Sequence, residues 1–252
     1  MTAPTWQTED GRVKLFHGDC LEILPTWPDG CLNALMTDPP YGIDNRWGDI
    51  HTGRNGNRRL SFSWDDAETS DNVSTRLALA MDKAARSAAL MVWCGFDTAR
   101  AYSDPARERS FVVKPFCWVK KCPPPPGKGV WWPSGFELGY YAYRRSPWFG
   151  DKSNKRCNVF VSDNYRHGQP GKVDHPTQKP LKLTMRHVSA IVRPGDLVAD
   201  PFMGSGTTGV AALRLGRKFW GIEIDKKYFD VAKRRILDEL NRHPLFEEPV
   251  SA

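Results

Sequence analysis

The sequence lacks the features that define several classes of protein. No apolar run approaches the ~20 residues that a membrane-spanning helix needs. Residues 1–10 do not place a basic stretch before an apolar one, so we expect no secretory signal and a cytoplasmic protein that binds no membrane. The six cysteines form no pair of Cys-x-x-Cys knuckles, and we expect no metal site. In the cytoplasm they should be reduced and mostly buried.

What the chain does contain fits one α/β domain that spans residues 1–252. Its hydrophobic content of 40% and aromatic content of 12% are those of a globular protein with a sizeable core. The formal net charge is +7. A basic balance favours a polyanionic partner, because each neutralised phosphate releases counterions. Charge alone does not separate nucleic-acid-binding proteins from other basic ones.

Hydrophobic periodicity predicts alternating strands and helices, which favours a mostly parallel sheet with helices on both faces. The predicted strands are 13–17, 32–37, 88–94, 110–120, 136–144, 197–199 and 218–224. The predicted helices are 21–24, 72–86, 181–192, 207–215 and 226–240. The tail after His243 should fray.

The segment between the strand at 197–199 and the following helix is typical of a nucleoside-binding turn. It reads Asp200-Pro-Phe-Met-Gly204-Ser-Gly206-Thr207, and its glycines allow a ligand to approach the backbone at a helix N-terminus. Glu223, near the end of the next strand, is placed to accept ribose hydroxyls. A tight turn without a ligand also fits this stretch taken alone.

Two common nucleotide motifs are missing from this turn. It has neither the Gly-x-Gly-x-x-Gly spacing of a dinucleotide site nor the Gly-Lys-Ser/Thr of a phosphate-binding loop. Asp200 would repel a pyrophosphate but would attract a cationic group, such as the amino group of an amino-acid moiety. These features favour S-adenosylmethionine over NAD or ATP.

Three segments together resemble the amino-group DNA methyltransferases. Asp38-Pro39-Pro40-Tyr41 resembles their Asp-Pro-Pro-Tyr catalytic signature, residues 200–207 resemble their cofactor motif, and residues 175–180, His-Pro-Thr-Gln-Lys-Pro, resemble the segment that precedes it. The order, with the catalytic motif first, is that of the permuted beta group. The resemblance covers roughly residues 13–240 and implies a Rossmann-like S-adenosylmethionine-dependent methyltransferase fold with circularly permuted motif order.

The chemistry of the first motif follows from its residues. An exocyclic amine is a poor nucleophile because its lone pair is conjugated with the ring. The Asp38 carboxylate and the Pro39 carbonyl can each accept one N–H of the amine, and Asp38 or a water then takes the proton. Tyr41 offers a face on which an extruded base can stack. The chain has no Pro-Cys dipeptide, so we exclude methylation of a cytosine ring carbon, which needs a cysteine nucleophile.

The resemblance also assigns roles to residues around the cofactor. It implies that Thr177 and Lys179 contact the cofactor carboxylate and that Asp200 contacts its amino group. Phe202, Gly204 and Gly206 would line the methionine side of the cofactor, with Ser205 and Thr207 in the same turn. Glu223 would hold the ribose of the cofactor. Asp19 occupies the position near the adenine ring, although it also fits a simple turn residue. His175 is expected to be structural.

Two segments without a core pattern carry arginines and aromatics suited to DNA contacts. They are a mobile loop at 42–66 and a target-recognition segment at 120–172. The expected partner is double-stranded DNA, and the permuted group suggests a homodimer.

Several functions remain open from the sequence. The resemblance associates an aspartate at position 38 mainly with adenine N6, and N4 of cytosine is the alternative. A non-catalytic DNA-binding protein of the same fold is a further reading. Methylation of RNA or of a protein glutamine usually goes with asparagine at that position, so it ranks lower.

Overall fold

The computed structural model describes residues 2–41, 67–123, 134–145, 148–150, 157–163, 171–173 and 177–242. The predicted loop at 42–66, His175, the tail from 243 and much of the segment at 120–172 lie outside these residues. The predictions made for them stay predictions.

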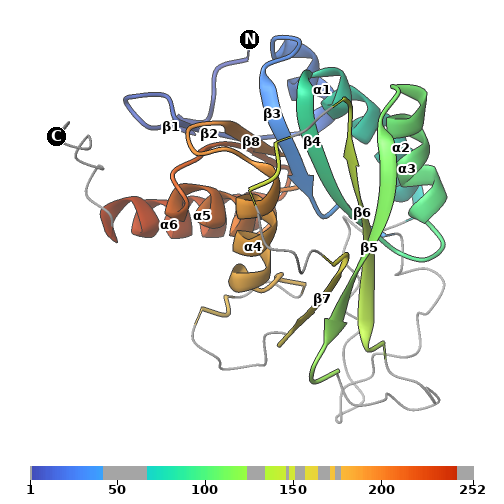
Figure 1. The fold of residues 1–252 in the computed structure, drawn as a ribbon. Coiled ribbons are helices and arrows are strands. Elements are labelled where there is room, and N and C mark those ends of the chain that lie inside the picture. The colour runs from blue at the N-terminus through green and yellow to red at the C-terminus, as the bar shows by residue number, and fades with distance from the viewer. Residues whose placement is uncertain are drawn as a thin grey trace, which may run out of the picture.

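Among the described residues, nine strands form one sheet in the order β1-β2-β9-β8-β3-β4-β6-β5-β7 (Figure 1). The strands are β1 Trp6–Gln7, β2 Val13–His17, β3 Leu32–Thr37, β4 Ala84–Cys94, β5 Val112–Lys120, β6 Phe136–Tyr143, β7 Val159–Ser162, β8 Leu197–Asp200 and β9 Lys218–Glu223. Strands β2, β9, β8, β3 and β4 run parallel, and β6 runs antiparallel to both β4 and β5. The predicted mixed, mostly parallel sheet is confirmed.

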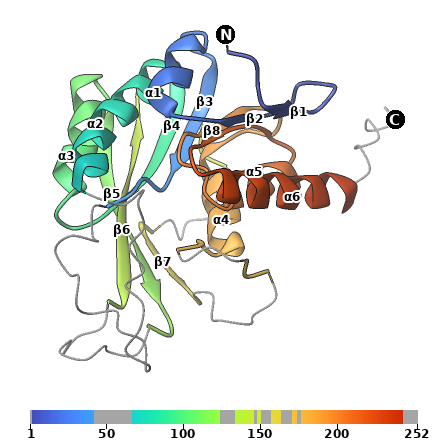
Figure 2. The same cartoon turned by 180° about the vertical axis from the view of Figure 1, so that it is seen from behind.

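Helices cover both faces of this sheet (Figure 2). One face carries α1 Cys20–Ile23, the 3-10 turn η1 Leu24–Thr26, α2 Ala67–Asp82 and α3 Ala99–Glu108, and the other carries α4 Leu181–Ile191, α5 Thr207–Arg214 and α6 Lys226–Arg242. Successive side chains of β3 point to opposite faces of the sheet, so this strand contributes to the hydrophobic core on each face. Leu35 packs into the first with Leu77, whereas Met36 packs into the second with Val210.

Most of the predicted elements are present, with shifted ends. Helix α2 begins at Ala67 and ends at Asp82, and β4 begins at Ala84, before the predicted strand at 88–94. Helix α3 was not predicted, and Pro105 lies inside it. Strand β7 was also missed, because it lies in a polar, basic stretch with little periodicity. Of the six cysteines only Cys20 and Cys94 are buried, so the expectation of mostly buried cysteines is wrong.

Strand β6 lies within the segment predicted to recognise DNA. It pairs along its length with β4 and β5, so this stretch belongs to the central sheet. Whether the rest of 120–172 contacts DNA stays a prediction.

The chain's connections diverge between β3 and β8, at the centre of the parallel strands. Strand β3 leads to β4 on one side, and β8 leads to β9 on the other. Ligands of such sheets bind beyond the carboxyl ends of the strands at this kind of switch point. Asp38 follows β3, while Asp200 ends β8 and Glu223 ends β9, so the sheet brings the predicted site residues to one edge.

Candidate active site

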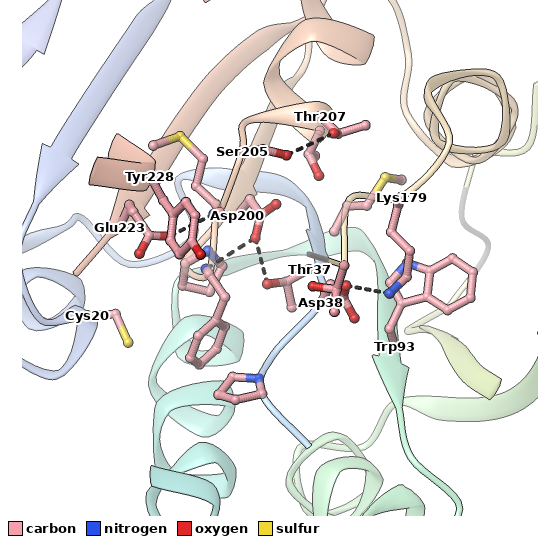
Figure 3. A pocket seen from close by; sticks show the side chains of 18 of the residues that line it. Cys20, Thr37, Asp38, Trp93, Lys179, Asp200, Ser205, Thr207, Glu223 and Tyr228 are labelled. Atoms are coloured by element: carbon pink, nitrogen blue, oxygen red, sulfur yellow. Dashed lines mark hydrogen bonds and ion pairs between the residues drawn. The ribbon is translucent and has the colours of Figure 1, made fainter. Parts of the chain in front are cut away.

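A cavity of about 390 Å³ lies at this edge of the sheet (Figure 3). Its volume falls within the ~300–1,000 Å³ typical of small-molecule sites. The predicted site residues that line it are Asp19, Asp38, Pro40, Thr177, Lys179, Asp200, Phe202, Gly204, Ser205, Thr207 and Glu223. Pro39, Tyr41 and Gly206 lie in the same turns without lining it. Ile224, Asp225 and Tyr228, which the sequence did not single out, also line it.

Hydrogen bonds from three tyrosine hydroxyls hold the turn that carries Asp38 and its surroundings. The hydroxyl of Tyr41 donates to Oδ1 of Asp38 at 2.6 Å, and the buried Tyr102 of α3 donates to the carbonyl of Pro40. Tyr140 of β6 donates in turn to the carbonyl of Tyr102 at 2.6 Å. Pro39 and Pro40 are buried and have fixed φ angles. The turn at Asp38 is therefore held by hydrogen bonds from Tyr41 and Tyr102, and Tyr140 in turn fixes Tyr102.

We expect Tyr102→Phe to lower the free energy of unfolding by about 1–3 kcal/mol, because the buried Pro40 carbonyl loses its donor. Urea denaturation followed by fluorescence measures the change. Tyr143→Phe is a matched control, since that ring stacks on Tyr141, and we expect a loss below about 0.5 kcal/mol. Equal losses in the two variants would contradict the proposed support of the turn.

The glycine-containing turn joins β8 to α5 and is fixed by α6. Gly206 has a φ of +75°, and a Cβ there would lie 2.9 Å from Cβ of Ala232. Arg235 donates to the carbonyl of Ser205 and, at 3.1 Å, to Oγ1 of Thr207. Glycine is therefore required at position 206 by both the backbone conformation and the neighbouring helix.

A direct hydrogen bond connects the turn at Asp38 with the glycine-containing turn. Thr37, which precedes Asp38, donates to Oδ1 of Asp200 at 2.7 Å. Burial raises the pKa of Asp200 to about 6, and hydrogen bonds from Thr37 and other groups oppose this shift only in part. Burial likewise raises the pKa of Glu223 to about 7, although its oxygens accept from the backbone N–H groups of Gly204 and Asp225. Both buried carboxyl groups would gain from a ligand that supplies cationic or hydroxyl donors.

Because of these two carboxyl groups, the free energy of unfolding of the cofactor-free protein should decrease as the pH rises. Their pKa values are raised from 3.8 and 4.5, so the folded state binds protons more tightly than the unfolded state. Their stabilising contribution is complete below about pH 4 and is lost as the pH rises through about 6–7. We expect Glu223→Gln to flatten this decline in thermal unfolding between pH 5 and 8. A decline as steep as that of the wild type would refute the assignment to Glu223.

Lys179 lies against the carboxylate of Asp38, a contact that the resemblance did not imply. Its ammonium contacts Oδ2 of Asp38 and lies 3.0 Å from Oε2 of Glu137 on β6. The other oxygen of Glu137 is 2.8 Å from Nζ of Lys120 on β5. Sequence reasoning missed Glu137, because nothing in the local pattern of β6 indicates which residue it faces. That Lys179 contacts the cofactor carboxylate stays a prediction.

The remaining predicted cofactor residues differ in their surroundings. Thr177 is exposed at the cavity. Asp19 caps α1 by accepting from the backbone N–H of Leu21 at 2.9 Å, and it pairs with Arg76 at 3.0 Å. Its turn role is therefore observed, while contact with an adenine ring stays a prediction. Within the described residues, no group of three or more histidine, cysteine, aspartate or glutamate side chains is arranged to hold a metal ion.

Comparisons with known proteins find relatives and solved structures that are similar to this chain. The chain is 27% identical over 256 residues to the type II methyltransferase M2.LlaDCHI of Lactococcus lactis subsp. cremoris, covering 94% of this chain and 93% of the relative. The crystal structure of the M1.HpyAVI–SAM complex superposes with a TM-score of 0.70 at 26% identity, covering 89% of this chain and 98% of that one. The cytosine-N4-specific PvuII DNA methyltransferase also has a TM-score of 0.70, but its 20% identity shows only a common fold.

The model of one protein family matches most of the chain. It is the N6/N4 methyltransferase family, described as DNA methylase, and the match runs from residue 32 to residue 234. This range begins with β3 and includes both the turn at Asp38 and the turn at residues 200–207. The chain therefore belongs to the N6/N4 family of DNA methylases.

Proposed function

We propose that this DNA methylase transfers a methyl group from S-adenosylmethionine to N6 of adenine in duplex DNA. One observation carries the proposal more than any other. The carboxylate that can accept an amine proton and the two carboxyl groups suited to the cofactor line one cavity, and Thr37 connects the turn at Asp38 with Asp200. The methyl donor, the target amine and the group that takes the proton can therefore meet in this cavity.

The residues of the cavity fit S-adenosylmethionine. Asp200 suits its ammonium group and Glu223 its ribose hydroxyls, and both would relieve the cost of burying these carboxyl groups. Phe202 and the exposed Ile224 add apolar surface to the same cavity. When bound, the cofactor supplies an electrophilic methyl group.

On this proposal Asp38 both orients the target amine and receives its proton. The carboxylate accepts one N–H, and the Pro39 carbonyl accepts the other, which localises the nitrogen lone pair. As the amine nitrogen takes the methyl group, whose bond to the sulfonium sulfur would break in the same step, the nitrogen would lose a proton to Asp38 or to a water beside it. Tyr41 donates to Asp38 and so keeps the carboxylate in one orientation.

The choice of adenine rests on the aspartate at position 38, which in the family goes mainly with N6 of adenine. N4 of cytosine carries an equivalent exocyclic amine, so the same geometry would serve it. The related protein specific for cytosine N4 shares only the fold, and therefore does not decide between the two bases.

Mass spectrometry of nucleosides decides the base. Genomic DNA lacking these modifications is treated with the protein and S-adenosylmethionine labelled in its methyl group. We expect labelled N6-methyladenine. Labelled N4-methylcytosine alone would replace adenine by cytosine, and no labelled base on any DNA would favour the non-catalytic reading.

Two further proposals concern partners. The net charge of +7 supports binding to DNA phosphates, so affinity should fall steeply with salt. A homodimer follows only from the resemblance to the permuted group, and light scattering would test it. No helix among the described residues is long and apolar enough to cross a membrane.

A further inference from the structure

Four charged side chains form an alternating row that starts at the catalytic turn. Asp38 contacts Lys179, Lys179 lies 3.0 Å from Glu137, and Glu137 lies 2.8 Å from Lys120. The row crosses from the turn after β3 to β6 and β5. Each side chain is at most a quarter exposed, so water screens these charges weakly.

This row creates a difficulty for the catalytic carboxylate. Both oxygens of Asp38 already have donors, because Tyr41 donates to Oδ1 and Lys179 to Oδ2. A target amine needs one of these oxygens. An ammonium held by Asp38 alone would also make the carboxylate a weaker base. Each carboxylate oxygen has a second lone pair, so an amine can still approach Asp38, but the carboxylate is a stronger base once Lys179 moves away from Oδ2.

The surroundings of Lys179 offer it a second position. Oε2 of Glu137 is 3.0 Å from the ammonium, and the rings of Trp93 and Tyr41 lie 5.0 and 5.7 Å from it. Aromatic faces stabilise a cation without fixing it to one partner. Lys179 can move toward Glu137 and remain paired.

We propose that Glu137 is a positioning residue that accepts Lys179 as the ammonium releases Oδ2 of Asp38 to the target amine. The inference rests on the proposed function, because it assumes that Asp38 receives the amine. Lys120 completes the row by holding the other oxygen of Glu137 in place. A buried ion pair is weak evidence for a purely stabilising role, since its desolvation cost offsets much of its attraction.

The groups that face Asp38 determine how each substitution moves its pKa. Burial raises this pKa, Lys179 lowers it, and Glu137 raises it. Tyr41 donates to the carboxylate, and its own pKa is raised well above 10.0, chiefly by burial. The thiol of Cys94 on β4, whose pKa is raised to about 11, and Asp200 at the end of β8 complete the set.

Two substitutions should therefore act in opposite directions. Glu137→Gln removes the second partner of Lys179, so the ammonium stays on Asp38 and lowers the basicity of the carboxylate. Lys179→Met removes the cation and so raises the basicity of the Asp38 carboxylate. We expect the acidic limb of the kcat profile to move by about one pH unit down in the first variant and about one unit up in the second. At saturating cofactor, kcat at pH 8 should fall about ten-fold in Glu137→Gln with little change in KM for DNA.

Matched variants separate positioning from folding. Glu137→Asp retains the charge and should restore most of the lost rate. Asp82→Asn removes a carboxylate from a different ion pair, with Arg109, and should leave the profile unchanged. Cofactor affinity measured by calorimetry should equal that of the wild type in both Glu137 variants. Loss of that affinity in both would indicate a structural role and would overturn the inference.

A readout without turnover distinguishes this inference from the proposed function. The ¹³Cγ resonance of Asp38, assigned by its loss in Asp38→Asn, reports the pKa of the carboxyl group directly. Relative to the wild type, we expect the pKa of Asp38 to be lower in Glu137→Gln and higher in Lys179→Met. Equal pKa values of Asp38 in the wild type and in Glu137→Gln would refute the role of Glu137 but not the proposed function. A wild type that methylates no DNA would instead refute the proposed function.

Discussion

Asp38→Asn is expected to transfer methyl groups at least about 1,000-fold more slowly than the wild type. The amide would present N–H groups to an amine that needs an acceptor, and it cannot take the proton. The shape of the side chain is kept, and Tyr102 still holds Pro40, so the turn should survive. Single-turnover kinetics with labelled cofactor measures the rate.

The control for this variant is Asp29→Asn. Asp29 is an exposed carboxylate that pairs with Lys83 at 2.7 Å, and we expect no change in rate when it is replaced. Cofactor binding by calorimetry and DNA binding by fluorescence anisotropy should remain near wild type in both variants. A rate for Asp38→Asn within ten-fold of the wild type would show that another group receives the proton.

Gly206→Ala should weaken cofactor binding at least ten-fold and destabilise the fold. The left-handed backbone costs a non-glycine residue about 1–2 kcal/mol, and overpacking against Ala232 adds about 1–3 kcal/mol. Relief of that contact would move either α6 or the turn at residues 200–207, which we propose holds the cofactor. Calorimetric titration with S-adenosylmethionine and urea denaturation measure the two effects.

Gly216→Ala separates the two causes of this loss. Gly216 has a φ of +72°, close to that of Gly206, but a Cβ there would meet no atom within 4 Å. We expect this variant to lose only the backbone contribution and to bind the cofactor normally. Equal losses in the two variants would mean that the contact with Ala232 has no consequence.

The sequence predicted those parts of the candidate site that are contiguous in the chain. The turns at Asp38 and at residues 200–207 each combine a strand end with rigid or glycine-containing backbone, and such local patterns can be read directly. The parallel arrangement of the strands then predicts that both turns meet at one edge. The same reasoning placed Glu223 at the end of β9, where the structure has it.

The parts that were missed depend on pairing between distant segments. Glu137 faces Lys179 only because β6 inserts between β4 and β5. Tyr102 reaches Pro40 from α3, a helix whose internal Pro105 and polar composition hid it from periodicity. A lone charged residue in a strand or a tyrosine in an unrecognised helix carries no local signal of its partner.

A crystal structure of the protein with S-adenosylhomocysteine and a duplex containing its methylation site would test the proposed mechanism most directly. We predict an adenine turned out of the duplex, with its amino group about 3 Å from the carboxylate of Asp38 and facing the sulfur. The ammonium of the ligand should lie at Asp200 and its ribose at Glu223. A target base that stays stacked, or an amino group that lies away from Asp38, would contradict the mechanism.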